Sequence, residues 1–315
     1  DNLQTILMFL KRFPQLAKSP LFITSESYGG HYMPTLASQI VDYNKKNGGV
    51  LNFKGFAVGN PYTDYYSGVG AEMETYWGKQ LLPKPSWDKY VASGCLEVET
   101  QFNNTACSSY IIEFMNKVGN LNPYALDYPV CITAQQAQTT EMIRKSIARN
   151  TNDLSAFFSV FKAAAEEYVP CEDNYAADYL NNNAVKTAIH VRTDIVWAEC
   201  SRTVKYEYVD KMLPMEHYYK DLLNSSSDKN LRILVYSGDD DSVCGTVGTQ
   251  KWIWDLGFKV KTNKYWNVWE IDGQTAGYIT QFNTPFSDAA RLTFMTVHFA
   301  GHEVPTYKPN EAFYL

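Results

Sequence analysis

The sequence predicts an α/β fold with a mostly parallel sheet, helices on both faces and a helical insertion. Strand-like and helix-like patterns alternate over residues 1–64 and again over 179–315, whereas 65–178 contains mixed helical stretches. An apolar run, a helical face and a second apolar run also succeed one another within about 40 residues, as in a βαβ unit. We therefore expect an α/β core in two parts, 1–64 and 179–315, with a disulfide-stapled cap over 65–178.

The first part of the core is expected to alternate helix and strand. Asp1 precedes apolar residues at helical spacing, which predicts a capped amphipathic helix that packs on another part of the protein. The elements that follow are a short buried strand, a helix ended by a polar Gly-containing run, and a second strand, over 21–24, 33–41 and 53–58. The chain is expected to begin inside a domain, so this part of the core is incomplete at its N-terminus.

The later elements are predicted in the same way. In the insertion we expect helices over 111–118, 134–148 and 154–167. In the second part of the core we expect a strand over 231–236, a helix over 246–256 and a hairpin of strands over 266–271 and 276–280. Leu292–Val297 is expected to close the last helix.

Composition excludes several classes of protein. The 315 residues are 45% hydrophobic and carry a net charge of −6, without the basic stripe that nucleic acids or anionic membranes require. No apolar run approaches the roughly 20 residues of a membrane span. Six cysteines without metal-ligand spacing and two glycosylation sequons, at Asn103 and Asn224, favour the secretory pathway.

Ser27 is the first candidate for chemistry. It lies in Ser25–Gly30, between an expected strand and an expected helix. A nucleophile elbow has the form G-x-S-x-G in this context, because the nucleophile sits in a strained turn that needs small neighbours. Here the first glycine is replaced by Ser25. The alternative is a turn with a helix N-cap serine, which explains many strand–Ser–helix junctions.

Three adjacent acids, Asp239, Asp240 and Asp241, follow the expected strand over 231–236. Carboxylates at this end of a strand lie on the edge where α/β sheets place their sites. Since the three charges repel one another, at least one should have a strong partner. The alternative is an Asx turn or a calcium loop.

His302 lies in a Gly-containing loop, Phe299–Pro305, near the end of the chain. A lone histidine is more often structural than catalytic. The other histidines, at positions 31, 190, 217 and 298, have neither such a loop nor an evident partner.

The order of these three residues along the chain strengthens the case for a catalytic role of each. Ser27, Asp241 and His302 follow the chain order of the α/β-hydrolases, which differs from the orders in chymotrypsin and subtilisin. Three unrelated structural roles would have to coincide in this order. The sequence therefore predicts a serine hydrolase.

Six segments give a resemblance to the serine carboxypeptidase family, running from the first residue to the last. They are Ser25–Ala37, Phe56–Asp64, Pro170–Asn181, Tyr236–Gly248, Thr275–Ile279 and Phe299–Pro305. The resemblance implies the α/β-hydrolase fold. It makes Ser27 the nucleophile, His302 the general base and acid, and Asp241 the residue that orients His302.

The resemblance also assigns roles to neighbouring residues. The backbone N–H of Tyr28 would form one half of the oxyanion hole, and Glu26 would hold the terminal carboxylate of the substrate. Asp239 would be structural. Cys244 would be a free, partly accessible thiol that lines the pocket.

A family loop with the second oxyanion donor and a carboxylate-binding asparagine has no counterpart, because the chain is expected to start after it. By analogy, Cys200 would pair with a cysteine of that missing N-terminal segment, which makes the segment a partner of this chain. Cys95–Cys107 and Cys131–Cys171 would staple the insertion.

The expected function is release of C-terminal amino acids from peptides at acid pH, through an acyl-enzyme on Ser27, without a cofactor or metal. One alternative is a serine-carboxypeptidase-like acyltransferase, which Glu26 opposes because the plant acyltransferases resemble this motif with aspartate before the nucleophile. Another is a non-catalytic chaperone or binding role. The expected partners are peptide or protein C-termini, and the oligomeric state, monomer or homodimer, stays open.

Overall fold

The computed structural model describes residues 1–65, 70–97, 104–128, 130, 175–198, 213–225 and 230–315. The chain divides into two units, one formed by 1–83, 123–127 and 211–315, the other by 84–122 and 128–210. The predicted domain boundaries after residues 64 and 178 stay a prediction. The helices predicted over 134–148 and 154–167 lie outside the described residues.

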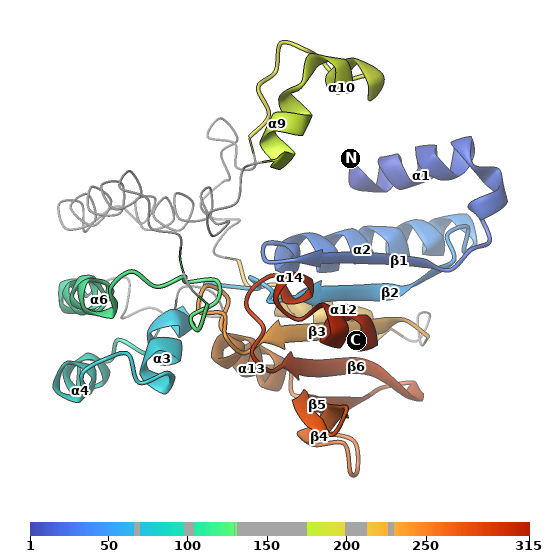
Figure 1. Cartoon of the computed structure of the whole chain (residues 1–315). Helices are drawn as coiled ribbons and strands as arrows, with labels where there is room; N and C mark the ends of the chain where they lie inside the picture. The colour runs from blue at the N-terminus through green and yellow to red at the C-terminus, as the bar shows by residue number, and fades with distance from the viewer. Residues whose placement is uncertain (66–69, 98–103, 129, 131–174, 199–212, 226–229) are drawn as a thin grey trace. The chain divides into compact units, whose positions relative to one another are not determined.

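A six-stranded sheet forms the first unit, in the order β1-β2-β3-β6-β5-β4 (Figure 1). The first four strands in this order are parallel, and the last two pairings are antiparallel. The strands are β1 (Leu21–Glu26), β2 (Phe53–Gly59), β3 (Arg232–Gly238), β4 (Asn267–Ile271), β5 (Gln274–Thr284) and β6 (Ser287–Val297). The predicted mostly parallel sheet and the C-terminal hairpin are confirmed.

The prediction that Leu292–Val297 ends a helix is wrong, because this segment belongs to β6. The strand pairs with β3 on one side and β5 on the other. Leu292 and the run from Phe294 to Val297 are buried, so residues on both faces of the strand avoid water. A strand covered on both faces loses the alternation that distinguishes it from a helix in sequence.

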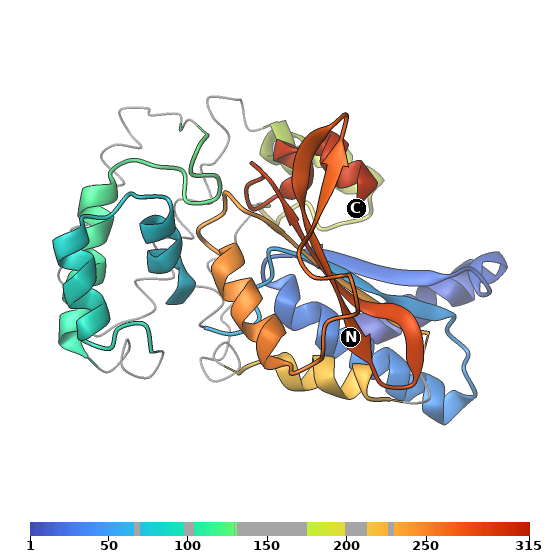
Figure 2. The same cartoon turned by 90° about the horizontal axis from the view of Figure 1, so that it is seen from below.

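Helices cover both faces of the sheet, as predicted (Figure 2). One face packs on α2 (Gly29–Asn47), α12 (Glu216–Leu223) and α13 (Thr246–Asp255), whose apolar residues share a core with β2, β3 and β6. A second cluster joins the end of β6 to α14 (Val304–Tyr307) and α15 (Pro309–Tyr314).

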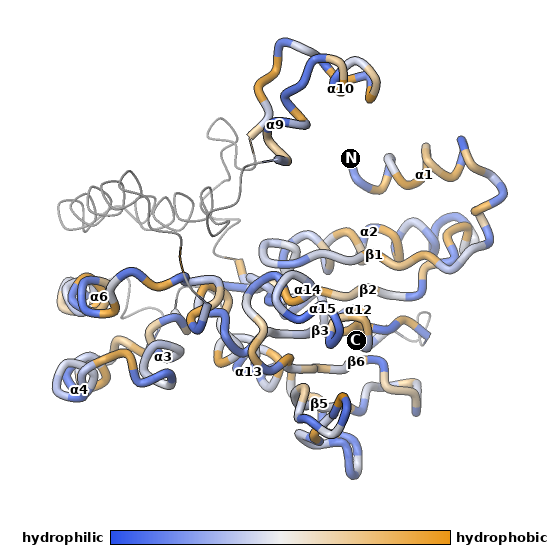
Figure 3. Tube along the Cα trace, in the orientation of Figure 1, coloured by the Kyte–Doolittle hydropathy of each residue, from blue (hydrophilic) through white to orange (hydrophobic). Residues whose placement is uncertain are grey.

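The first helix, α1 (Asn2–Arg12), is followed by the short 3₁₀ helix η1 (Pro14–Leu16). None of the residues of α1 is buried, although apolar and polar residues alternate along it (Figure 3). Asp1 occupies the N-cap position but makes no side-chain capping hydrogen bond, which corrects the prediction of a capped start. Leu3, Ile6, Leu7 and Leu10 on its apolar side are half-buried, whereas Met8 and Phe9 are exposed.

In the second unit the described helices are α4 (Lys84–Ala92), α6 (Thr105–Val118), α9 (Tyr175–Asn181) and α10 (Asn183–Ala188). Asn104 starts α6, because its side chain accepts a hydrogen bond from the backbone of Ala106. The predicted Cys95–Cys107 disulfide is present, with 5.4 Å between its Cα atoms. Within the described residues no helix is long and apolar enough to cross a membrane.

The register of the parallel strands determines where the functional loops start. Glu26 pairs with Gly59, and Gly59 pairs with Tyr236. The strands β1, β2, β3 and β6 therefore end at one edge of the sheet, where the segments after residues 26, 59, 238 and 297 emerge together. The remaining helix of the first unit, α3 (Ala71–Gly78), follows the loop after β2.

Candidate active site

Ser27 lies in a sharp turn between β1 and α2. Its φ of 58° is in the left-handed region, as expected for a residue held in a strained elbow. The turn is fixed on both sides, since Ser27 N donates to Gly59 O (2.9 Å) and Tyr62 N donates to Ser27 O (2.7 Å). A Cβ at Gly29 would lie 2.4 Å from Ser25 Oγ, so the glycine makes room for the serine that replaces the usual first glycine.

Asp241 is fully buried, and its carboxylate is surrounded by donors. Its Oδ2 accepts hydrogen bonds from Nδ2 of Asn60 (2.9 Å) and from the backbone of Cys244 (3.1 Å), while Oδ1 accepts from the backbone of Val243 (2.8 Å). Nδ1 of His302 lies 2.7 Å from the same Oδ2. These partners stabilise a buried negative charge that would otherwise be costly.

His302 is 3% exposed, and its Nδ1 faces the carboxylate of Asp241. Its backbone N–H donates to Tyr124 O (2.7 Å), and the Tyr124 ring stands edge-on to the imidazole. In the tautomer whose Nδ1–H donates to the Asp241 carboxylate, Nε2 is left to accept a proton. No direct hydrogen bond joins Ser27 to His302 among the described residues, and such contacts are often long before substrate binds.

Several carboxylates control the protonation of His302. Burial alone would lower its pKa, but the charge and hydrogen bond of Asp241, with smaller contributions from Glu303 and Glu26, raise it to about 9. Burial raises the pKa of Glu303, as does the charge of Glu26, while His302 opposes the rise. Glu26, Glu303 and His302 therefore form one electrostatic group.

Each of the three adjacent acids has a different partner. Asp239 Oδ2 lies 2.6 Å from Nδ1 of His298, Asp240 Oδ1 lies 2.6 Å from Nζ of Lys79, and Asp241 pairs with His302. The expectation that at least one acid has a strong partner is met by all three. The expectation that His298 lacks a partner is wrong, because β6 ends beside the loop that carries Asp239.

Asn60 is a site residue that the sequence did not single out. Besides binding Asp241, it accepts from the backbone of Gly238 through Oδ1 (2.9 Å), and its own N–H donates to Tyr236 O (2.8 Å). It connects the end of β2 to the end of β3 and to the aspartate loop. A carboxamide after a strand at this edge is the signal that could have identified it.

Glu26 and Tyr28 flank Ser27. Glu26 is the last residue of β1 and is exposed, and Tyr28 occupies the N-cap position of α2. The backbone at the start of a helix carries partial positive charge, which suits an oxyanion. Their roles toward a substrate stay predictions at this point.

Cys244 is a free thiol, but it is only 1% exposed, so the expected partial accessibility is not present in this structure. Burial and the charges of Asp241 and Glu72 raise the pKa of this thiol well above its usual range. Glu72 itself is fully buried and accepts from Tyr76 Oη (2.7 Å). Burial raises the pKa of Glu72 to about 8, although the Tyr76 hydrogen bond opposes the rise.

Cys131, Cys171, Cys200 and the sequon residue Asn103 lie outside the described residues. Asn224 is exposed where α12 ends.

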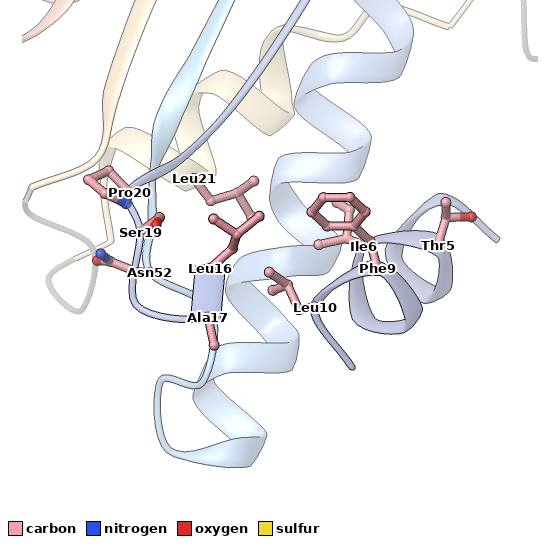
Figure 4. Close-up of a pocket in the computed structure, with 10 residues that line it drawn as sticks. All are labelled: Thr5, Ile6, Phe9, Leu10, Leu16, Ala17, Ser19, Pro20, Leu21 and Asn52. Atoms are coloured by element: carbon pink, nitrogen blue, oxygen red, sulfur yellow. The ribbon is translucent and has the colours of Figure 1, made fainter. Parts of the chain in front are cut away.

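An apolar pocket of about 390 Å³ lies at the other end of β1, far along the strand from Ser27 (Figure 4). Its walls come from α1, η1 and the start of β1 and include Ile6, Phe9, Leu10, Leu16 and Leu21. It contains none of the predicted site residues. It is therefore separate from the candidate active site.

Comparison with known proteins identifies the family of this chain. The family model "Serine carboxypeptidase" matches residues 1–315. Serine carboxypeptidase 24 of Arabidopsis thaliana is 32% identical over 320 residues, and serine carboxypeptidase-like 22 of the same plant is 30% identical over 322 residues. Both alignments cover 100% of this chain and 64% of the relative, so the chain spans less than two thirds of these proteins.

A solved structure shares the fold. The crystal structure of a prohormone-processing carboxypeptidase from Saccharomyces cerevisiae matches with a TM-score of 0.64 and 19% identity, over 95% of this chain and 62% of that one. The likeness supports the α/β-hydrolase fold expected from the sequence. With the family model matching every residue, this chain belongs to the serine carboxypeptidase family.

Proposed function

We propose that this chain is the larger part of a serine carboxypeptidase that releases C-terminal amino acids from peptides at acid pH. The observation that carries the proposal is the buried Asp241–His302 pair, at 2.7 Å, on the sheet edge where Ser27 sits in a strained elbow. A buried imidazole held by a carboxylate beside a strained serine suits a base and its nucleophile.

The proposed reaction has two steps. Ser27 Oγ attacks the last peptide carbonyl while Nε2 of His302 takes its proton, and the backbone N–H of Tyr28 donates to the oxyanion. His302 then returns the proton to the leaving amine, so the C–N bond breaks and the C-terminal amino acid departs. Water, activated by His302, releases the acyl group from Ser27.

Glu26 is proposed to bind the terminal carboxylate of the substrate. Two ionised carboxylates repel at hydrogen-bond distance, so Glu26 can donate a hydrogen bond only when it is protonated. This requirement favours peptide acids at low pH.

Protonation of Glu26 and Glu303 also favours the neutral form of His302, which the proposed base requires. An imidazolium cannot accept a proton from Ser27, and the pKa of His302 is raised to about 9 after burial is offset chiefly by Asp241. Glu303 and Glu26 contribute to this rise only while they are ionised. Protonation of these two glutamates removes their charge and lowers the pKa of His302. At a given pH the neutral fraction of the imidazole is then larger than it would be beside two ionised glutamates.

A segment of the whole protein outside this chain is proposed to complete the site. β1 ends the sheet on one side, and apolar side chains beside it are exposed, including Phe9 (49%) and Phe22 (45%). The pocket of Figure 4 lies on this same side. The segment would supply the second oxyanion donor and a disulfide to Cys200.

The cellular location of the protein is proposed from its disulfide and its glycosylation sequon. A disulfide and an exposed sequon at Asn224 suit a glycoprotein of the secretory pathway, in a vacuole, a lysosome or outside the cell. The division into core, cap over 65–178 and core is proposed for the domains.

The nucleophile is tested by fluorophosphonate labelling of the full-length protein. Ser27→Ala should abolish labelling and lower kcat on a blocked dipeptide by roughly 10⁴-fold or more, whereas the neighbouring Ser25→Ala should retain both. Labelled protein that transfers acyl groups from a sugar ester to alcohols but releases no amino acid would indicate an acyltransferase. An unlabelled wild type would favour a binding role.

Glu26 is tested by comparing a blocked dipeptide with its C-terminal amide. The kcat/KM of the peptide acid should fall as Glu26 ionises, because two carboxylates then face each other, while the amide should escape this loss. Glu26→Gln should remove the difference between the two pH profiles. Parallel profiles in the wild type would reduce Glu26 to a structural role.

Glu303 is tested through the acid limb of kcat/KM. Glu303→Gln removes a negative charge that favours the imidazolium, so the pKa of His302 should fall from about 9 and the acid limb should move to lower pH, by roughly one unit or less. Glu303→Asp keeps the charge and should leave the limb in place. An acid limb at the same pH in Glu303→Gln and in the wild type would show that Glu303 does not influence the pKa of His302.

The completing segment is tested with the 315-residue chain alone. It should show little turnover on a blocked dipeptide and should bind a dye for exposed apolar surface. Adding or co-expressing the preceding part of the protein should restore turnover and lower dye binding. Appreciable turnover by the chain alone would refute this part of the proposal.

A further inference from the structure

Lys79 bridges two acids near the candidate active site. It directly follows α3, and its Nζ lies 2.6 Å from Oδ1 of Asp240 and 2.7 Å from Oδ2 of Asp127. The Asp240 side chain is fully buried, whereas Asp127 is half exposed. Asp240 immediately precedes Asp241, so Lys79 neutralises a buried charge one residue from the residue that holds His302.

Residues 123–127, here called the strap, bind the loop on both sides of Asp241. Leu126 N donates to Asp240 O (3.0 Å), and Asp127 N donates to Asp240 Oδ2 (2.9 Å). Beyond Asp241, both N and Oγ of Ser242 donate to Pro123 O, at 2.9 and 2.7 Å. The strap therefore holds the aspartate loop at two points.

The strap also holds the histidine loop. His302 N donates to Tyr124 O at 2.7 Å, and the Tyr124 ring stands edge-on to the imidazole with 5.1 Å between ring centroids. A Cβ at Gly301 would lie 2.4 Å from Tyr124 O, so the loop approaches the strap closely. One short segment thus contacts the loops of Asp241 and His302.

We propose that Lys79 is a positioning residue, which clamps the strap against Asp240 and thereby holds the His302 imidazole in line with Ser27. This inference rests on the proposed function of the triad. Asp241 keeps its bonds from Asn60, Val243 and Cys244 without Lys79, so loss of the clamp moves the strap and the histidine loop.

The charges around Lys79 predict how its loss would change the position of the strap. The buried carboxylate of Asp240 would face Asp127 without its ammonium partner, and like charges at this range repel. The strap would move away from Asp240, and the contacts of Tyr124 with His302 would weaken. Misplacement by about 1 Å can lower the rate of a reaction roughly 100-fold, while substrate binding changes less.

The test compares four variants of the full-length protein. Lys79→Met removes the clamp, Lys79→Arg keeps its charge, and Lys79→Met with Asp240→Asn removes both charges of the buried pair. Lys84→Met is the matched control, because Lys84 also pairs with an aspartate, Asp88, but on the surface. The readouts are the rate of Ser27 labelling by a fluorophosphonate, kcat and KM on a blocked dipeptide, and the thermal midpoint.

Lys79→Met should lower kcat and the labelling rate by roughly 10- to 100-fold, with KM changed by less than about threefold. Lys79→Arg should remain within a few-fold of the wild type, since a cation still bridges both acids. The double variant should recover most of the labelling rate, because no buried charge then drives the strap away. Lys84→Met should match the wild type.

Other outcomes overturn the inference. Folded Lys79→Met that labels as fast as Lys84→Met would show that Lys79 positions nothing, even if its thermal midpoint is lower. A double variant as slow as Lys79→Met, or Lys79→Arg as slow, would also refute the clamp. A wild type labelled at Ser27 that releases no amino acid would refute the proposed function alone, and the labelling rates would still decide on Lys79. A wild type without labelling would refute both.

Discussion

A carboxylate without access to water requires hydrogen-bond donors, and the loops of this site are arranged around that requirement at Asp241. Its two oxygens accept from the end of β2 through Asn60, from its own loop through Val243 and Cys244, and from His302. These donors come from segments far apart in the sequence. They converge because the parallel strands end together, so satisfying one buried charge brings the edge loops into register.

The chemistry proposed for the site depends on how negative charge is distributed around the histidine. Asp241 fixes the imidazole and is the main cause of the raised pKa of His302, while Glu303 and Glu26 add smaller contributions. Protonation of these glutamates would let Glu26 donate a hydrogen bond to the substrate carboxylate and would also lower the pKa of His302, the proposed base. The pH range of the proposed activity would thus depend on this group and not on His302 alone.

The sequence predicted what local pattern encodes and missed what depends on distant contacts. The elbow serine, the aspartate loop and the C-terminal histidine follow from motif and chain order, and the parallel sheet follows from alternating elements. β6 was mistaken for a helix end because burial on both faces removes the alternation typical of a strand. The roles of Asn60 and Lys79 could not be read from local pattern, because Asp241 lies 181 positions from Asn60 and Asp240 lies 161 positions from Lys79.

The left-handed conformation of Ser27 has a consequence for the evolution of the site. Side chains branched at Cβ are strongly disfavoured at a φ of 58°, so threonine cannot replace this hydroxyl without reshaping the turn. Cysteine has an unbranched Cβ and fits the same backbone. Descendants of this protein that keep the turn between β1 and α2 could therefore replace the proposed serine nucleophile with cysteine but not with threonine.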